Sequence, residues 1–131
     1  MSELDFSISA WLRKAENDVL NIENNLAAKE IPWDTICFHA QQGAEKLLKA
    51  FLITQGHEVQ RTHDLVAVLS ECVKINPSLS QLEEDCRKLT YFAVSGRYPD
   101  DVFEPDEQDG RNMVEAPYRL RSVLLPLLTN R

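Results

Sequence analysis

The sequence FHAQQGAEKLLKAFL, residues 38–52, combines an apolar helical pattern with polar groups that a purely structural helix does not need. Its apolar residues recur every three or four positions, which is the spacing of one face of an α-helix. His39, Gln41 and Gln42 interrupt that pattern near its start. The stretch therefore predicts a core helix that also carries a polar site.

The rest of the chain has the same helical periodicity and no stretch with the alternation of a β-strand, so we expect an all-α fold. Pro32 separates the first helix from the central one, and Gly56 ends the central one. Asn76-Pro77 stops the third helix. The approximate helical ranges are residues 8–26, 36–51, 63–73, 78–92 and 113–128.

Length and charge restrict the class of protein. The 131 residues suit one compact domain, residues 1–131. The net charge of −7, from 21 acidic and 14 basic side chains, disfavours binding of nucleic acid over a broad surface. No apolar run reaches the roughly 20 residues of a membrane span, and the polar start is unlike a signal peptide. We therefore expect a cytoplasmic protein that does not enter a membrane.

The cysteines and the acidic cluster do not indicate a metal or cofactor site. Cys37, Cys72 and Cys86 lie far apart and form no CxxC pair, so we expect buried free thiols. We expect the carboxylates within residues 100–109 to be solvated or to stabilise the start of the last helix, in preference to binding magnesium. No cofactor is expected.

Three polar patches are candidate ligand sites, and each has a structural alternative. His39 and Gln42 lie three residues apart on one helix, where they could bind a base or a phosphate together, or simply be solvated. His63 begins a helix whose free amides could receive an anion, but the stronger explanation is that Thr62 or His63 caps that helix, with Asp64 favouring its first-turn amides.

The third patch is Arg97-Tyr98-Pro99-Asp100. The guanidinium of Arg97 offers paired donors for a phosphate, and the Tyr98 ring could stack on a base. The alternative is an ion pair between Arg97 and a neighbouring carboxylate. Arg97, Tyr98, His39, Gln42 and His63 are thus the candidate ligand-binding residues, and no residue is predicted to be catalytic.

The stretch at residues 38–50, together with Thr62-His63-Asp64-Leu65 and Arg97-Tyr98-Pro99, closely resembles HEPN domains, and the resemblance covers nearly the whole chain. It implies an up-and-down bundle of four main helices plus a short extra helix, usually a homodimer, in prokaryotic cytoplasm. It also implies binding of an ATP-like nucleotide. The partner implied for this subgroup is a minimal nucleotidyltransferase, in an arrangement like a toxin–antitoxin module.

Other HEPN proteins are metal-independent ribonucleases that use an Arg followed, after four to six residues, by a His. This sequence lacks that motif, because Arg97 precedes no His and no Arg stands at that distance before His39, His57 or His63. We therefore expect a non-catalytic nucleotide-binding protein. Two alternatives stay open: a ribonuclease toxin in which His39 or His63 approaches Arg97 through space, and a bundle that serves only as a protein-interaction module.

Overall fold

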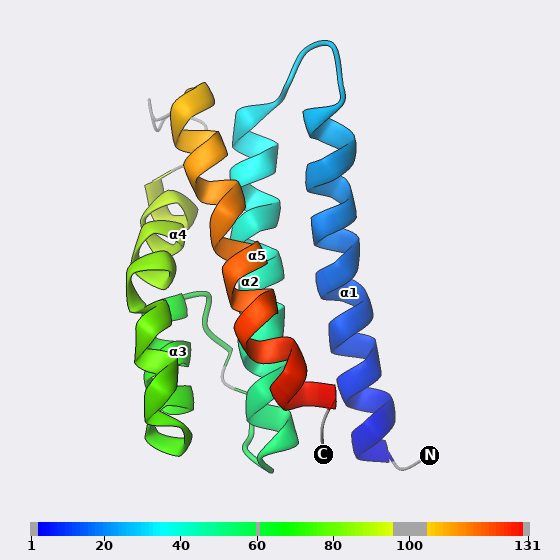
Figure 1. Ribbon diagram of the computed structural model, residues 1–131, viewed down its shortest axis with the longest axis vertical. Coiled ribbons are helices and arrows are strands. Elements are labelled where there is room, and N and C mark those ends of the chain that lie inside the picture. The colour runs from blue at the N-terminus through cyan, green and yellow to red at the C-terminus, as the bar shows by residue number, and fades with distance from the viewer. Residues whose placement is uncertain (1–2, 60, 96–104, 130–131) are drawn as a thin grey trace.

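The structure is a computed structural model, and it describes residues 3–59, 61–95 and 105–129. These residues form helices and contain no strand, which confirms the predicted all-α bundle of four main helices and a short one, to which the structure adds a 3₁₀ helix (Figure 1). The elements are α1 (Glu3–Leu26), α2 (Trp33–Thr54), α3 (Leu65–Ile75), the 3₁₀ helix η1 (Pro77–Leu82), α4 (Glu83–Ser95) and α5 (Glu107–Thr129).

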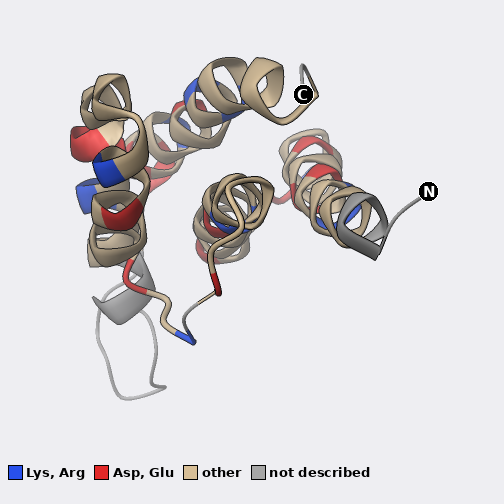
Figure 2. Ribbon diagram, turned by 90° about the horizontal axis from the view of Figure 1, so that it is seen from below, with Lys and Arg blue, Asp and Glu red and all other residues tan. Residues whose placement is uncertain are grey.

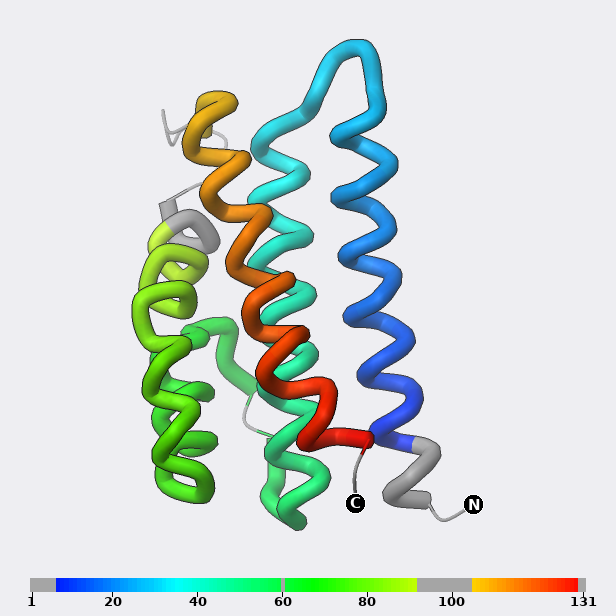
Figure 3. Tube along the Cα trace, viewed as in Figure 1, coloured from blue at the N-terminus to red at the C-terminus, as the bar shows by residue number. Residues whose placement is uncertain are grey.

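Helix α2 is the centre of the bundle and packs against α1, α3, α4 and α5 (Figure 2). Its neighbours surround most of it, so that Ile36, Ala40, Leu47 and Leu48 are at most 1% exposed. One apolar cluster contains buried residues from α1 through α5 and from η1. Figure 3 follows the chain and shows that the first half of α1 and the end of α5 lie at the same end of the bundle.

The helix boundaries mostly follow the sequence signals. Helix α2 ends at Thr54, just before Gly56 as predicted, and the φ of 76° at Gly56 lies in the left-handed region that favours glycine. The amides of Gly56 and His57 donate to the carbonyls of Ile53 and Leu52, both at 3.0 Å, which closes the helix in a Schellman motif. Helix α1 begins earlier than predicted, at Glu3.

The chain after α3 differs from the prediction, because it forms the 3₁₀ helix η1 before α4 begins. Asn76 caps η1, and its side chain accepts a hydrogen bond from the amide of Ser78 at 3.2 Å. At the start of α5, Asp106 and Asp109 exchange two hydrogen bonds, since each carboxylate accepts from the other residue's amide. The described part of the acidic cluster thus stabilises a helix start, as expected.

Ion pairs attach α5 to its neighbours. The guanidinium of Arg119 donates two hydrogen bonds, of 2.8 and 2.5 Å, to Asp85 of α4, whose carboxylate is 5% exposed. This contact raises the pKa of Arg119 above its ordinary value. On the other side, Arg121 donates to Glu16 of α1 at 2.6 and 3.0 Å. Ion pairs therefore connect α5 to α4 on one side and to α1 on the other.

No helix in the described ranges is both long enough and apolar enough to span a lipid bilayer. The three cysteines in those ranges are free and buried, which confirms the expectation for Cys37, Cys72 and Cys86.

Gly110 lies where α5 meets the ring of Trp33 at the start of α2. A Cβ atom at position 110 would overlap the aromatic carbons of Trp33, so we expect Gly110→Ala to destabilise the protein by about 1–3 kcal/mol. In a helix without such a contact, the same substitution would stabilise by up to about 1 kcal/mol. Urea unfolding measures whether the substitution raises or lowers the free energy of unfolding. The control is Asn112→Ala at an exposed position of the same helix, which should stay within about 0.5 kcal/mol of wild type.

Candidate functional site

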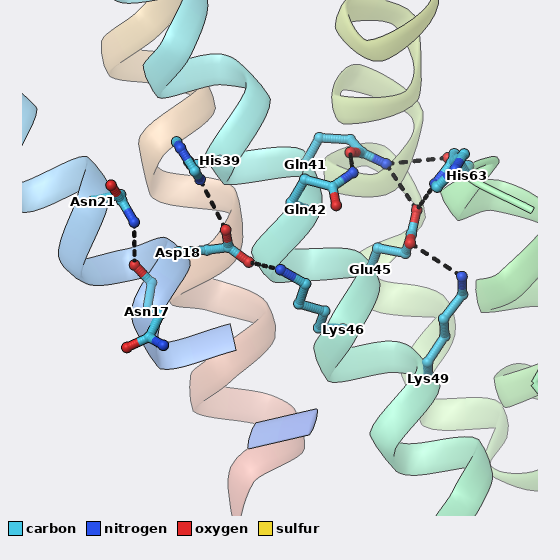
Figure 4. Close-up of polar contacts among 10 residues, drawn as sticks. All are labelled: Asn17, Asp18, Asn21, His39, Gln41, Gln42, Glu45, Lys46, Lys49 and His63. Carbon is cyan, nitrogen blue, oxygen red and sulfur yellow. Dashed lines mark hydrogen bonds and ion pairs between the residues drawn. The ribbon is translucent and has the colours of Figure 1, made fainter. Parts of the chain in front are cut away.

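A buried carboxylate, Glu45, is the centre of a polar network on α2 (Figure 4). Its Oε1 accepts from Nε2 of Gln41 at 3.1 Å and from Nδ1 of His63 at 2.8 Å. Its Oε2 accepts from Nζ of Lys49 at 3.0 Å. Gln41, Glu45 and Lys49 are at most 5% exposed, whereas the His63 side chain is 65% exposed. The network therefore extends from the core to the surface at His63.

Gln41 joins this network to the chain that precedes α3. Its Nε2 also donates to the backbone carbonyl of His63 at 3.2 Å, and its Oε1 accepts from Nε2 of Gln42 at 2.7 Å. His63 is thus fixed at two points, through its ring by Glu45 and through its carbonyl by Gln41. Gln42, which is partly exposed, is connected to His63 through Gln41.

The charges of Glu45 and Lys49 are costly to bury. Removing a carboxylate or an ammonium from water costs several kcal/mol per ion, and the attraction between the two offsets that cost only when the remaining hydrogen bonds are made. The three donors to Glu45 supply those bonds. Apolar residues of similar volume would stabilise such a position as well or better. Stability alone therefore does not account for this pair, which makes the network a candidate functional site.

A second buried carboxylate, Asp18, joins α1 to another side of α2. Its Oδ1 lies 2.8 Å from Nδ1 of His39, and its Oδ2 accepts from Nζ of Lys46 at 2.6 Å. Asp18 is 5% exposed and the His39 side chain 21%. Gly43 allows this approach, since a Cβ atom there would lie only 3.3 Å from Cβ of Asp18. Both carboxylates therefore hold a histidine on one oxygen and a lysine on the other.

The start of α3 has no free amides for an anion among its first residues. Asp64 is the N-cap, and its Oδ1 accepts from the amides of Val66 and Ala67 at 3.0 and 3.3 Å. The amide of Leu65 donates to Oγ1 of Thr90 on α4 at 3.1 Å. The helix start is therefore capped, but the predicted cap was wrong: Asp64, which was expected among the first-turn residues, is the N-cap in place of Thr62 or His63.

The structure places the predicted residues in two networks. His63 and Gln42 are connected through Gln41, while His39 contacts Asp18 and does not share a partner with Gln42. In the view of Figure 4, Gln42 lies between the two histidines. Arg97 and Tyr98 lie outside the described residues.

Sequence reasoning did not single out the two carboxylates or their lysine partners. A signal was available in the central helix, where Gln41, Glu45 and Lys49 follow one another at intervals of four residues. These positions share a face with the buried residues Leu48 and Leu52. Charged residues that interrupt an apolar face in this way indicate a buried network. Asp18 had a similar signal, because it lies three residues after Ala15 and four before Ile22 on the apolar face of α1.

The described surface near Lys49 has a small hollow lined by Lys49, Leu52, His57, Glu58, Val68 and Glu71. Its volume of about 30 Å³ is far below the roughly 300–1,000 Å³ of pockets for small molecules. The hollow is large enough for water but not for a nucleotide. No group of His, Cys, Asp or Glu side chains in the described ranges is arranged to hold a metal ion.

The cysteines are poor nucleophiles in this structure. Burial raises the pKa of Cys37, Cys72 and Cys86 to about 12, so the thiols stay protonated at neutral pH. Their side chains pack in the apolar core and contribute to it as small apolar groups.

The fold and the site together define an all-α bundle protein with a buried polar centre on its central helix. Residues 8–124 match the HEPN domain family, so the chain belongs to that family. A solved structure, that of ST0689, described as an archaeal HEPN homologue, has a TM-score of 0.72 to this chain. The match has 22% sequence identity and covers 93% of this chain and 98% of ST0689, which shows a shared fold. A comparison with curated proteins gives no significant match.

Removing the carboxylate of Glu45 should destabilise the bundle strongly. We expect Glu45→Ala to lower the free energy of unfolding by about 3–5 kcal/mol, because the buried ammonium of Lys49 then loses its partner. The matched variant is the double substitution Glu45→Leu with Lys49→Met, which removes both charges and should leave stability equal or higher. Urea unfolding of both variants measures the difference. Equal losses would show that the ion pair is needed for the fold itself.

The thiols should be inert in the folded protein. We expect no rapid reaction of Cys37, Cys72 or Cys86 with a thiol-specific disulfide reagent at about pH 8.5, the ordinary pKa of a free thiol, because burial raises their pKa. The absorbance of the chromophore that the reagent releases follows the reaction. All three should react when the protein is unfolded in guanidinium, and a fast native phase would contradict the burial of the thiol that reacts.

Proposed function

We propose that this HEPN protein binds a nucleotide without catalysing a reaction of its own, and acts with a minimal nucleotidyltransferase in a toxin–antitoxin-like module. The observation that supports binding is the Glu45 network, in which buried charges lead to an exposed histidine. Buried ion pairs that do not improve stability are candidates for positioning groups at a ligand site. The proposed partner rests on the resemblance to HEPN domains of this subgroup.

In this proposal, the ligand contacts come from two parts of the chain. Arg97 binds the phosphates and Tyr98 stacks on the base, while His39, Gln42 and His63 contribute polar groups from α2 and from the start of α3. The hydrogen bond from Leu65 to Thr90 supports this combination, because it joins the chain next to His63 to the second half of α4. Arg97 follows shortly after the end of that helix. The nucleotide would thus lie beside α2 and α4.

The proposal also includes a homodimer. It rests on the resemblance to HEPN domains, because the hollow near Lys49 is too small for a nucleotide and is lined by none of the proposed ligand-binding residues. The net charge of −7 favours a small anionic ligand at a local cationic group over a long RNA on the surface. The sequence has no Arg and His at the spacing that HEPN ribonucleases use, which supports a role in binding without cleavage.

Thermal unfolding with a panel of nucleoside triphosphates tests nucleotide binding. A ligand present at about a hundred times its Kd should stabilise wild type by roughly 2.7 kcal/mol. We expect Arg97→Ala to abolish this shift. The matched control is Arg87→Ala, which removes an exposed arginine of α4 that pairs with Glu83 and Glu84, and which should keep the shift.

Two further results would change the proposal. If no nucleotide stabilises wild type, nucleotide binding by the isolated protein is rejected, and a protein-interaction module becomes the better hypothesis. Cleavage of RNA in the presence of EDTA, lost in His39→Ala or His63→Ala, would favour the ribonuclease alternative. Copurification of a coexpressed nucleotidyltransferase with wild type would support the proposed partner.

A further inference from the structure

We infer that the base of the nucleotide stacks on the ring of Phe38 and donates a hydrogen bond from an amino group to Oε1 of Gln42. The inference rests on the proposed function and deepens it, because it names the residues that bind the base and the kind of base that they fit. Both residues lie on α2, four positions apart and therefore neighbours on the same side of the helix.

Phe38 is a large apolar side chain at the surface of the central helix. It is 57% exposed, although most of α2 is buried among the other helices. Its ring therefore has apolar surface that a planar ligand can cover. Every nucleobase has a π-face that stacks on an aromatic side chain, and the opposite face of the base stays available to a second ring.

The network of Asp18 holds the Phe38 ring in place. The His39 ring makes a T-shaped contact with it, with 5.3 Å between the ring centroids and 77° between the ring planes. His39 is held in turn by Asp18, since Nδ1 lies 2.8 Å from Oδ1. A ring that is already packed against a fixed neighbour loses less freedom when a ligand binds. Asp18 thus positions Phe38 through His39.

The network of Glu45 fixes the orientation of the Gln42 amide (Figure 4). Nε2 of Gln41 donates to Glu45 and to the backbone carbonyl of His63, and because a carbonyl has no hydrogen to donate, this end of the Gln41 amide is the nitrogen. Oε1 of Gln41 therefore faces Gln42, whose Nε2 donates to it at 2.7 Å. Oε1 of Gln42 is left as an acceptor. This orientation does not depend on the charge of the His63 ring.

The Gln42 amide can bind the edge of a base. Gln42 is partly exposed, and no donor among the described residues reaches its Oε1. Its Nε2 has a second hydrogen besides the one that it donates to Gln41. An amide with a free acceptor and a free donor matches adenine, whose amino group donates and whose neighbouring ring nitrogen accepts. Adenine is therefore the base that this position fits.

The charges on this part of α2 favour an uncharged group over a phosphate. Asp18 and Glu45 each have a lysine partner, Lys46 at 2.6 Å and Lys49 at 3.0 Å. Both ammonium groups are thus already paired with a carboxylate, and Lys49 is also buried. A phosphate would have to compete with those carboxylates, whereas a neutral base leaves both ion pairs intact.

ATP and purine riboside triphosphate, which lacks the amino group of ATP, test the contact with Gln42. By titration calorimetry, we expect wild type to bind ATP about five- to tenfold more tightly than the analogue, the effect of one hydrogen bond. Gln42→Met removes the amide at similar length and should bind both ligands with the same Kd. The control is Gln55→Met, at an exposed glutamine directly after α2, which should keep the preference for ATP.

Phe38→Leu tests the stacking. We expect it to raise the Kd of ATP and of the analogue alike by about tenfold, because stacking does not depend on the amino group. Phe38→Trp keeps an aromatic face and should bind both ligands about as tightly as wild type. Leu20→Ala, at an exposed leucine of α1, is the control and should not change either Kd. Circular dichroism of each variant confirms that it is folded.

The outcomes separate this inference from the proposed function. If a nucleoside triphosphate binds wild type, Phe38→Leu and Gln42→Met equally well, nucleotide binding stands and the assignment of the base to α2 is wrong. If wild type binds ATP and the analogue equally, or binds another triphosphate and not ATP, the role of Gln42 is overturned. If wild type binds no nucleotide, both the inference and the proposed function are rejected.

Discussion

The ion pair between Glu45 and Lys49 is the constraint around which the neighbouring structure is arranged. Both groups lie inside the bundle, and each needs partners that remain in place when water is excluded. Gln41 and His63 supply the remaining hydrogen bonds, and Gln41 also holds the backbone before α3. The position of that connection is therefore set by the central helix. Apolar packing alone would not determine which residue of that connection contacts Glu45.

The second carboxylate shows how close packing and polar contacts depend on each other. Asp18 reaches His39 and Lys46 because α1 comes close to α2 at Gly43. A larger residue at position 43 would separate the helices or displace Asp18. The two carboxylates thus give α2 one polar contact with α1 and another with the chain before α3. Both contacts hold a histidine with its ring oriented.

Much of the fold could be predicted from the sequence. Apolar periodicity identified every long helix, and Gly56 and Pro32 marked the boundaries of α2 correctly. The buried cysteines and the role of Asp106 and Asp109 at the start of α5 also followed from residue type and position. The 3₁₀ helix η1 and the early start of α1 were not predicted, because local signals there favour more than one boundary.

The site could be predicted only in part. The sequence by itself determined the helices, the residues that interrupt the apolar face of α2, and the resemblance to HEPN domains. The tertiary structure decided that Glu45 holds His63, that Asp18 holds His39, and that Asp64 occupies the amides of α3. The physical reason is that periodicity reports which side of a helix faces inward. Which polar groups meet across helices depends on how closely those helices pack, and at Gly43 that distance is set by a missing side chain.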